Sequence, residues 1–324
     1  MTRSRVFRSQ NKFKQDFGDI YNQPDPRRYF GALEPLQYMI PQHSKPVFET
    51  VIAALRSTRG LDTVTVLDLG CSYGINAALL KYGLSMSDLY SHYGALGSRE
   101  LSREESLERD AAMLKQQLKN SHLRFIGVDV APEAVAYATE AGLLDVGVAA
   151  NFETGPPSPE AAAKMATADL VISSGCVGYV TEQTFTRILD TTESETPPWV
   201  ASFVLRMFPY DAISEALAER GFVNEKLAGH TFVQRSFASE CEQAHVIEQL
   251  AQMKINPAGR EAEGCYHAEF YLSRPQHEAA RAPLETIIAD ASLPCRSRQV
   301  GDTLPMQAQL PGADRAQSPQ RDDD

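Results

Sequence analysis

Short apolar runs alternate with amphipathic segments along most of the chain. The runs are rich in Val, Ile, Leu and Phe, and several of them end at an acidic residue or a glycine. Apolar residues between the runs recur at helical spacing, so each run is predicted to be a buried strand followed by a helix. The expected strands span residues 63–68, 123–130, 146–150, 168–175 and 200–208, with further strands at 222–227 and 265–273. This alternation predicts an α/β fold with a doubly wound, mostly parallel, seven-stranded sheet.

The same pattern divides the chain into a core and its additions. Residues 1–43 begin with a polar, basic stretch and are expected to form an N-terminal arm or lid. The core is expected over residues 44–275, opening with a helix that runs from about Ser44 to a stop at Gly60. Residues 276–324 become rich in Pro, Gln, Arg and Asp and are predicted to be a tail that is at least partly disordered.

Residues 81–122 exceed what a plain β-α-β unit needs and are predicted to be a helical insertion. Ser102 and Glu105 have the spacing of a capping box, which marks the start of a charged helix. Four apolar side chains of that helix follow one stripe, and we expect this stripe to be buried. They are Leu107, Ala111, Leu114 and Leu118.

Composition and charge narrow the classes of function. The chain has 31 basic and 42 acidic residues, and the resulting formal charge of -11 makes nucleic acid an unlikely partner. No apolar run reaches the length of a membrane span, and no signal core follows the N-terminus, so a cytoplasmic location without membrane contact is expected. The five cysteines are predicted to be reduced thiols, and no metal site is predicted, because His267-Ala268-Glu269 lacks the cysteines of a zinc deaminase.

Three predicted strand ends carry residues that suit a ligand containing adenosine. The first strand runs into a turn with Gly70 and Gly74, whose missing side chains let the backbone bend sharply and approach a ligand. The second strand ends at Asp129, a carboxylate that can accept both ribose hydroxyl protons. The third leads to Asn151 and Phe152, an amide and a ring that suit adenine. Because the carboxyl ends of parallel strands border one crevice, we expect these residues to lie together.

The turn differs from the dinucleotide-binding fingerprint Gly-x-Gly-x-x-Gly. Ser72 stands where the middle glycine belongs, and Asp68 directs a negative charge into the site. A carboxylate there suits an ammonium or sulfonium ligand better than pyrophosphate. Gly70 and Asp129 are also 59 residues apart (129 minus 70), whereas a plain unit places its acid about 20 residues on. The insertion accounts for the excess, unless Asp129 is the wrong acid.

Two segments resemble motifs of class I S-adenosylmethionine-dependent methyltransferases: Val66-Leu67-Asp68-Leu69-Gly70-Cys71-Ser72-Tyr73-Gly74 and Phe125-Ile126-Gly127-Val128-Asp129. The resemblance implies that Asp68 and the turn hold the methionine part of the cofactor, S-adenosylmethionine. It implies that Asp129 binds the ribose, that Asn151 and Phe152 lie at the adenine, and that the segment from Ser173 to Cys176 borders the methyl group. The cofactor-binding residues that it implies are Asp68, Gly70, Cys71, Ser72, Gly74, Asp129, Val130, Asn151, Phe152 and Ser174.

The function that this resemblance implies is methyl transfer from S-adenosylmethionine to an O, N or C atom of a small molecule. Such an in-line transfer needs a base only if the acceptor carries a proton. Candidates for binding the acceptor or removing its proton are His43, Tyr38, Tyr210 and His230. Two other functions stay open: a non-catalytic module that keeps the cofactor or its demethylated product as a structural ligand, and an NAD-dependent oxidoreductase, which the turn disfavours.

Each candidate residue also has a structural alternative. The glycine turn could connect a strand and a helix without any ligand, and Asp129 could cap the helix that follows it. Phe152 could belong to the core, and Asn151 could satisfy a turn. Cys71 and Cys176 could pack as small apolar side chains, because no neighbouring feature favours a thiolate.

Overall fold

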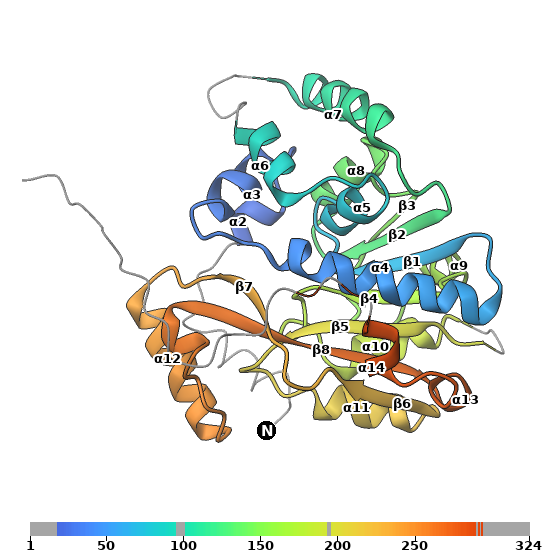
Figure 1. Cartoon of the computed structure of the whole chain (residues 1–324). Helices are drawn as coiled ribbons and strands as arrows, with labels where there is room; N and C mark the ends of the chain where they lie inside the picture. The colour runs from blue at the N-terminus through green and yellow to red at the C-terminus, as the bar shows by residue number, and fades with distance from the viewer. Residues whose placement is uncertain (1–17, 95–100, 193–195, 290, 292, 294–324) are drawn as a thin grey trace, which may run out of the picture.

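The chain is organised around a sheet that is mostly parallel (Figure 1). The computed structural model describes residues 18–94, 101–192, 196–289, 291 and 293. The strands are β1 Val64–Leu69, β2 Leu123–Asp129, β3 Val146–Ala149, β4 Leu170–Ser173, β5 Trp199–Leu205, β6 Phe222–Lys226, β7 Phe232–Ser236 and β8 Cys265–Pro275. Their order is β3-β2-β1-β4-β5-β8-β6, with β7 paired to β8. The α/β, doubly wound, mostly parallel sheet predicted from the sequence is confirmed.

Helices lie on both faces of this sheet. They are α2 Gly18–Tyr21, α3 Arg27–Leu33, α4 Ile40–Arg59, α5 Ile75–Leu80, α6 Met86–Gly94, α7 Arg103–Gln117, α8 Pro132–Glu140, α9 Pro159–Met165, α10 Glu182–Leu189, α11 Asp211–Ala218, α12 Glu240–Gln252, α13 Gln276–Ala279 and α14 Leu284–Ile288. Figure 1 shows α4, α5 and α8 on one face, with α9, α10 and α11 on the other. The central strands β1, β4 and β5 are buried along their whole length, as is typical of strands covered by helices on both faces.

Strand β1 lies at the middle of the parallel part and sets the position of the site. All six of its residues are buried, and it pairs in parallel with β2 on one side and β4 on the other. The chain first builds outwards through β2 and β3, then crosses back to β4 and β5. Ligands of open α/β sheets bind outside the carboxyl ends of the strands where the order reverses in this way. For this chain that place lies between the ends of β1 and β4.

Strand β7 and helix α9 were not predicted. In β7, Gln234 and Arg235 are both buried, and the Arg235 guanidinium pairs with the Glu242 carboxylate of α12 at 2.7 Å. A strand that buries polar side chains against a distant partner lacks the apolar alternation on which prediction depends. Helix α9 begins at Pro159, and Ser158 caps it by accepting a hydrogen bond from the Ala161 amide.

Helix α4 begins at Ile40 rather than at the predicted Ser44. Proline favours the first turn of a helix. Pro41 occupies the first turn of α4, and Pro46 lies inside the helix. Ile40 is fully buried, so tertiary packing extends the helix by one turn. Its end was predicted correctly: Gly60 adopts the left-handed conformation, with φ of 63°.

The insertion contains α6 and α7, and the capping box of Ser102 and Glu105 is present. The predicted stripe is buried only in part: Leu114 is buried, Leu107 and Ala111 are half-buried, and Leu118 is 51% exposed. The other buried residues of α7 are Ser106 and Asp110. The Asp110 carboxylate accepts hydrogen bonds from the hydroxyls of Tyr93 at 2.6 Å and Tyr137 at 2.7 Å. It also pairs with Nε2 of His92 at 2.7 Å. Two of these donors belong to α6 and one belongs to α8. The Asp110 carboxylate therefore lies where α7 meets both helices.

The two chain ends lie partly in the described residues. Helices α2 and α3 of the predicted arm contact each other, and α3 also contacts α6 of the insertion. At the other end, α14 packs on α4 and buries Leu284 completely. Glu278 of α13 forms a bidentate pair with Arg59 at 2.9 Å. The rest of the predicted arm, residues 1–17, and nearly all of the tail from residue 290 lie outside the described residues.

Some features are absent from the described part of the chain. No helix in it combines the length and apolar character needed to cross a bilayer. The residues described here also bring together no group of three or more His, Cys, Asp or Glu side chains suited to a metal ion.

Candidate functional site

The turn after β1 uses three left-handed residues to reverse the chain tightly. Gly70, Ser72 and Gly74 have φ of 78°, 47° and 77°. A Cβ on Gly70 would lie 2.7 Å from Cβ of Cys176, and one on Gly74 would lie 3.0 Å from Cβ of Leu143, so both positions require glycine. Ser72 is therefore strained in the conformation that glycine adopts most easily. Ser72 thus keeps the left-handed backbone conformation that the middle glycine of a Gly-x-Gly-x-x-Gly fingerprint would adopt easily.

Asp68 lies at the end of β1 and is fully buried. Its Oδ1 accepts a hydrogen bond from Nδ2 of Asn76 at 2.9 Å, whereas its Oδ2 has no partner among the described residues. Burial raises the pKa of Asp68 to about 7, the Asn76 amide opposes this rise, and the nearby Asp129 adds to it. The carboxylate is thus held in place through one oxygen and left open to a donor or cation at the other.

Asp129 lies at the end of β2, on the other side of the turn. Its Oδ2 accepts from the backbone amide of Ser72 at 2.9 Å, and its Oδ1 accepts from the amide of Ala131 at 3.0 Å. Burial raises its pKa, and these amides oppose the rise. Ala131, not Asp129, is the N-cap residue of α8, so the simple helix-cap alternative does not describe this carboxylate. Asp129 instead joins the turn after β1 to the end of β2.

The end of β3 lies next to Asp129, whose carbonyl accepts from the amide of Ala150 at 2.9 Å. Val130 is 64% exposed and Asn151 is exposed, so both present side chains outside the core. The Asn151 Oδ1 accepts from the Glu153 amide at 2.9 Å, which is the turn role that the sequence left open.

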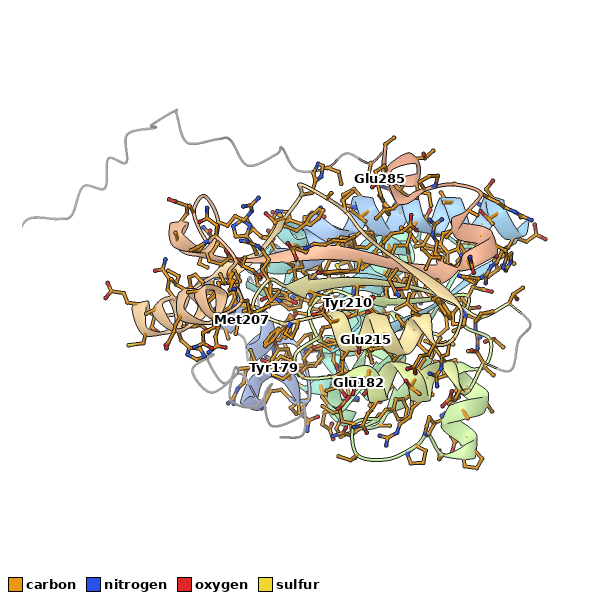
Figure 2. The ribbon with its side chains drawn as sticks, turned by 90° about the horizontal axis from the view of Figure 1, so that it is seen from below. Tyr179, Glu182, Met207, Tyr210, Glu215 and Glu285 are labelled. Carbon is orange, nitrogen blue, oxygen red and sulfur yellow. The ribbon has the colours of Figure 1, made fainter. Side chains whose placement is uncertain are left out.

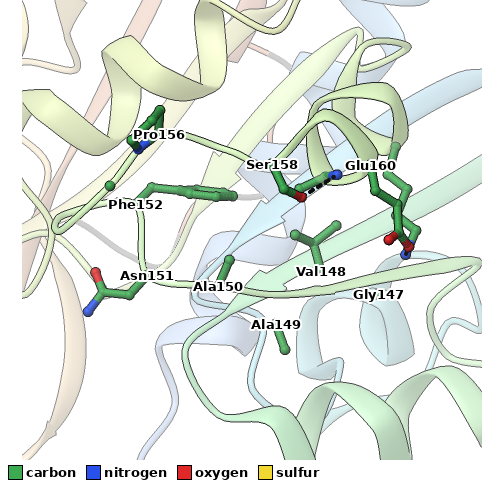
Figure 3. Close-up of a pocket in the computed structure, with 12 residues that line it drawn as sticks. Gly147, Val148, Ala149, Ala150, Asn151, Phe152, Pro156, Ser158 and Glu160 are labelled. Carbon is green, nitrogen blue, oxygen red and sulfur yellow. Dashed lines mark hydrogen bonds and ion pairs between the residues drawn. The ribbon is translucent and has the colours of Figure 1, made fainter.

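Phe152 takes the opposite direction from Asn151. Its ring is 4% exposed and points toward Ser158 at the start of α9 (Figure 3). It lines a cavity of about 260 Å³ between β3 and α9. This orientation favours the core alternative for Phe152, although both Phe152 and Asn151 line the cavity (Figure 3).

The end of β4 completes the cluster around Asp68. The Ser174 hydroxyl accepts from Nδ2 of Asn76 at 3.1 Å, so Asn76 joins Asp68 to Ser174. Sγ of Cys176 lies 3.0 Å from the Ser173 hydroxyl. Burial raises the pKa of Cys176 to about 12 and that of Cys71 well above its usual value. Both thiols therefore stay protonated at neutral pH, which supports the packing role and disfavours a nucleophile.

Beyond β5 the sheet changes from parallel to antiparallel pairing. Strand β8 lies between β5 and β6 and runs antiparallel to both, next to five parallel strands ordered β3-β2-β1-β4-β5. Acidic residues lie at or near the ends of β1 and β2, on either side of the glycine turn. This strand order agrees with the doubly wound, mostly parallel sheet predicted from the sequence.

Comparisons with known proteins add three distant likenesses. No family model and no curated protein sequence matches the chain. Among solved structures, the plantazolicin methyltransferase BpumL with S-adenosylhomocysteine is 13% identical over 84% of this chain and 96% of its own, with a TM-score of 0.41. Magnesium protoporphyrin IX methyltransferase from Synechocystis PCC 6803 with bound S-adenosylmethionine is 11% identical over 85% and 98%, with a TM-score of 0.36. The [4+2]-cyclase SpnF is 13% identical over 70% and 80%, with a TM-score of 0.33. Because these TM-scores are below 0.5, we base nothing on the likenesses.

Tyr38 is the candidate catalytic residue that the fold brings near this cluster. A Cβ on Gly175, just after β4, would lie 3.9 Å from the Tyr38 hydroxyl and 2.8 Å from Nε2 of Gln234. Burial raises the pKa of Tyr38, and the nearby Tyr90 and Asp68 add to the rise. The phenol is therefore a hydrogen-bond donor at neutral pH and a poor base.

The other three candidates lie elsewhere. Nδ1 of His43 is 2.9 Å from the Val233 carbonyl of β7, so this ring is held against that strand. Tyr210 precedes α11 on the face seen in Figure 2, and its ring stacks on Tyr271 with centroids 4.3 Å apart. Burial raises the pKa of Tyr210 to about 12, and its hydroxyl makes no hydrogen bond of normal geometry within the described chain. His230 lines a second cavity beyond β5.

Two buried residues of the site were missed from the sequence. Asn76 is 4% exposed and orients Asp68, and the signal for it was available: it is the polar residue in the otherwise apolar helix Ile75–Leu80. Gln234 reaches Gly175 from β7. The sequence around Gln234 does not predict that contact. Strand β7 is positioned by its pairing with β8, which is distant in the sequence.

Proposed function

We propose that the protein is an S-adenosylmethionine-dependent methyltransferase that acts on an O, N or C atom of a small molecule. The observation that carries this proposal is the pair of carboxylates on either side of the turn after β1, the fully buried Asp68 and the half-buried Asp129. Neither carboxylate forms an ion pair with a described Lys, Arg or His side chain. A buried negative charge without a counter-ion is costly, and a cationic ligand relieves that cost.

The residues present fit this cofactor. The unpartnered Oδ2 of Asp68 suits the ammonium group of the methionine part, and the absence of a Cβ at Gly70 leaves the backbone open to close approach. Two hydrogen bonds occupy part of the Asp129 carboxylate, and the remaining lone pairs suit the ribose hydroxyls. The exposed Val130 and Asn151 follow β2 and β3 and suit the adenine.

When bound, S-adenosylmethionine supplies a methyl group activated by its sulfonium. The chain's own residues then orient and shield the reactants, which is the main requirement of an in-line transfer. Tyr38, whose raised pKa keeps its phenol protonated, donates a hydrogen bond that positions the acceptor near the end of β4. We assign no base, so the proposal favours acceptors whose reacting atom is nucleophilic without one.

Two alternatives remain distinct from this proposal. An NAD-dependent oxidoreductase would bring pyrophosphate to the turn, and Asp68 would repel it. A non-catalytic module would bind the cofactor by the same carboxylates and transfer nothing. Incubation of the protein with methyl-labelled S-adenosylmethionine and a metabolite extract separates these: label in a small molecule supports the enzyme, and its persistent absence despite cofactor binding supports the module.

Substitution of Asp129 tests the cofactor site. We expect Asp129→Asn to weaken binding of S-adenosylhomocysteine by about 10-fold to 100-fold, since a hydrogen bond to a charged group contributes roughly 1.5–3 kcal/mol. Isothermal titration calorimetry measures this change. Asp62→Asn, in the exposed loop before β1, is the matched control and should bind as the wild type does. Unchanged affinity in Asp129→Asn would show that the ribose role is wrong.

A further inference from the structure

A second cavity, of about 300 Å³, lies beyond the carboxyl end of β5. It is bordered by the residue after β5, by the end of β6, by the loop between β6 and β7, and by β8. Six of its nine lining residues are polar or charged, and four of these are basic. The lining residues are Arg206, Lys226, Leu227, Ala228, Gly229, His230, Thr231, Arg260 and Glu269. None of these residues belongs to the turn after β1 or to the end of β2.

Arg206 is 7% exposed and supplies a buried donor to this cavity. One terminal nitrogen pairs with Glu261 at 2.5 Å, and the other donates to the Asn256 carbonyl at 3.0 Å. Its Nε has no hydrogen-bond partner in the described chain, and the nearest carboxylate, Glu269, is 3.8 Å away. A buried N–H of a charged group without an acceptor is costly, and an anion in the cavity removes that cost.

Arg260 is a second cation of the cavity and is held in position by a chain of hydrogen bonds. Its Nε donates to Oγ1 of Thr231 at 3.2 Å, and that hydroxyl lies 3.1 Å from Nδ1 of His267. Burial lowers the pKa of His267 to about 4, and Arg206 and Arg260 lower it further. The imidazole is therefore neutral at pH 7, and the Thr231 hydroxyl donates to it. Arg260 has no carboxylate partner among the described residues, which leaves its terminal nitrogens for a ligand.

The charges around the cavity do not cancel. Three cations, Arg206, Lys226 and Arg260, face two carboxylates, Glu261 and Glu269. Lys226 lies 2.7 Å from Glu269, and Arg206 occupies Glu261. The excess positive charge belongs to Arg260, in a chain whose formal charge is -11. A small anion would bring this local excess close to zero.

We propose that this cavity binds the carboxylate or phosphate group of a small molecule, through Arg260, the Nε of Arg206 and Lys226. Guanidinium groups match both kinds of anion, because their planar N–H donors pair with two oxygens at once. The cavity has the size of one such group with a few attached atoms. A nucleic acid backbone does not fit, because it needs a row of cations and the remaining charge of the chain opposes it.

Titration of the full chain with sodium phosphate and with sodium acetate tests this site, with sodium chloride at matched ionic strength as the reference. We expect the free energy of unfolding to rise and calorimetry to give a Kd on the order of 1 mM for at least one anion. Tighter binding of phosphate identifies a phosphate ester as the ligand class, and tighter binding of acetate identifies a carboxylate. Equal behaviour in all three salts would overturn the proposal.

Arg260→Gln is expected to weaken binding of the preferred anion at least 10-fold. Arg124→Gln, at the opposite end of the sheet, is the matched control and should leave it unchanged. If Arg260→Gln does not fold, Lys226→Gln takes its place, because Lys226 is exposed. Thr231→Val should weaken binding less than Arg260→Gln, since it frees Arg260 without removing the charge. Anion affinity that survives Arg260→Gln or Lys226→Gln in a folded protein would contradict the site, whereas binding of S-adenosylhomocysteine should be unaffected by either variant.

Discussion

Asp68→Asn is expected to stabilise the ligand-free protein at pH 8, by on the order of 2–4 kcal/mol. The folded-state pKa of Asp68 is raised from 3.8 to about 7 by burial. The folded state therefore binds more protons than the unfolded state between about pH 4 and pH 7, so stability falls as pH rises through this range. Asparagine resembles the protonated carboxyl group and carries no such penalty. The difference between variant and wild type should thus be largest at pH 8 and clearly smaller at pH 5.

Urea denaturation at pH 5 and pH 8 measures both differences. Asp62→Asn is the control, because this exposed residue should change stability little at either pH. A lower stability of Asp68→Asn at pH 8 would contradict the account, and so would a difference that does not depend on pH.

The same substitution should weaken binding of S-adenosylhomocysteine by about 100-fold at pH 8, since it removes a buried charge opposite the ammonium group. In the wild type, affinity should fall as pH drops below about 7, because Asp68 must lose its proton to pair with the ligand. The variant should lose this dependence on pH. A gain in stability with a loss of affinity is the behaviour of a residue retained for binding.

Asp110→Ala is expected to lower the free energy of unfolding by about 3–5 kcal/mol. The carboxylate is 1% exposed and accepts hydrogen bonds from Tyr93 and Tyr137, so its removal leaves two buried hydroxyls without an acceptor. It also removes the partner of His92. Tyr137 belongs to α8 in the core, whereas Tyr93 and His92 belong to α6. The substitution therefore removes contacts within the insertion and the hydrogen bond that joins the insertion to the core.

Urea denaturation checks this value against two matched variants. Glu108→Ala removes an exposed carboxylate from the same helix and should cost less than about 0.5 kcal/mol. Asp110→Asn keeps one acceptor and should fall between the two. A cost for Asp110→Ala as small as that for Glu108→Ala would show that the hydrogen bonds of Asp110 contribute little.

The parallel strands could be predicted because the residues that define each strand and its end are close together in the sequence. Strands such as Val64–Leu69 are mostly apolar, and each is followed by glycine or by a helix with its own start signal. The elements that were missed are stabilised by residues that belong to other helices and strands. Strand β7 buries Arg235 against Glu242 of α12, and α7 buries Asp110 as well as Leu114, so hydrophobicity alone did not identify all of the buried residues.

Some features of the candidate site can likewise be predicted from neighbouring residues in the sequence, whereas others depend on tertiary packing. An acid followed by closely spaced glycines marks the turn in the sequence, and the left-handed φ of Ser72 explains how the turn survives without its middle glycine. The orientation of Phe152 toward α9, the contact of His43 with β7 and the approach of Tyr38 to Gly175 depend on tertiary packing. No periodicity in the sequence encodes which of these side chains faces the crevice.

Calorimetric titration of the wild-type protein at pH 8 with S-adenosylhomocysteine, and separately with NAD, tests the central claim most directly. The account predicts one-to-one binding of S-adenosylhomocysteine with a Kd on the order of micromolar and no measurable binding of NAD. Binding of NAD, or no binding of S-adenosylhomocysteine by a folded protein, would contradict it.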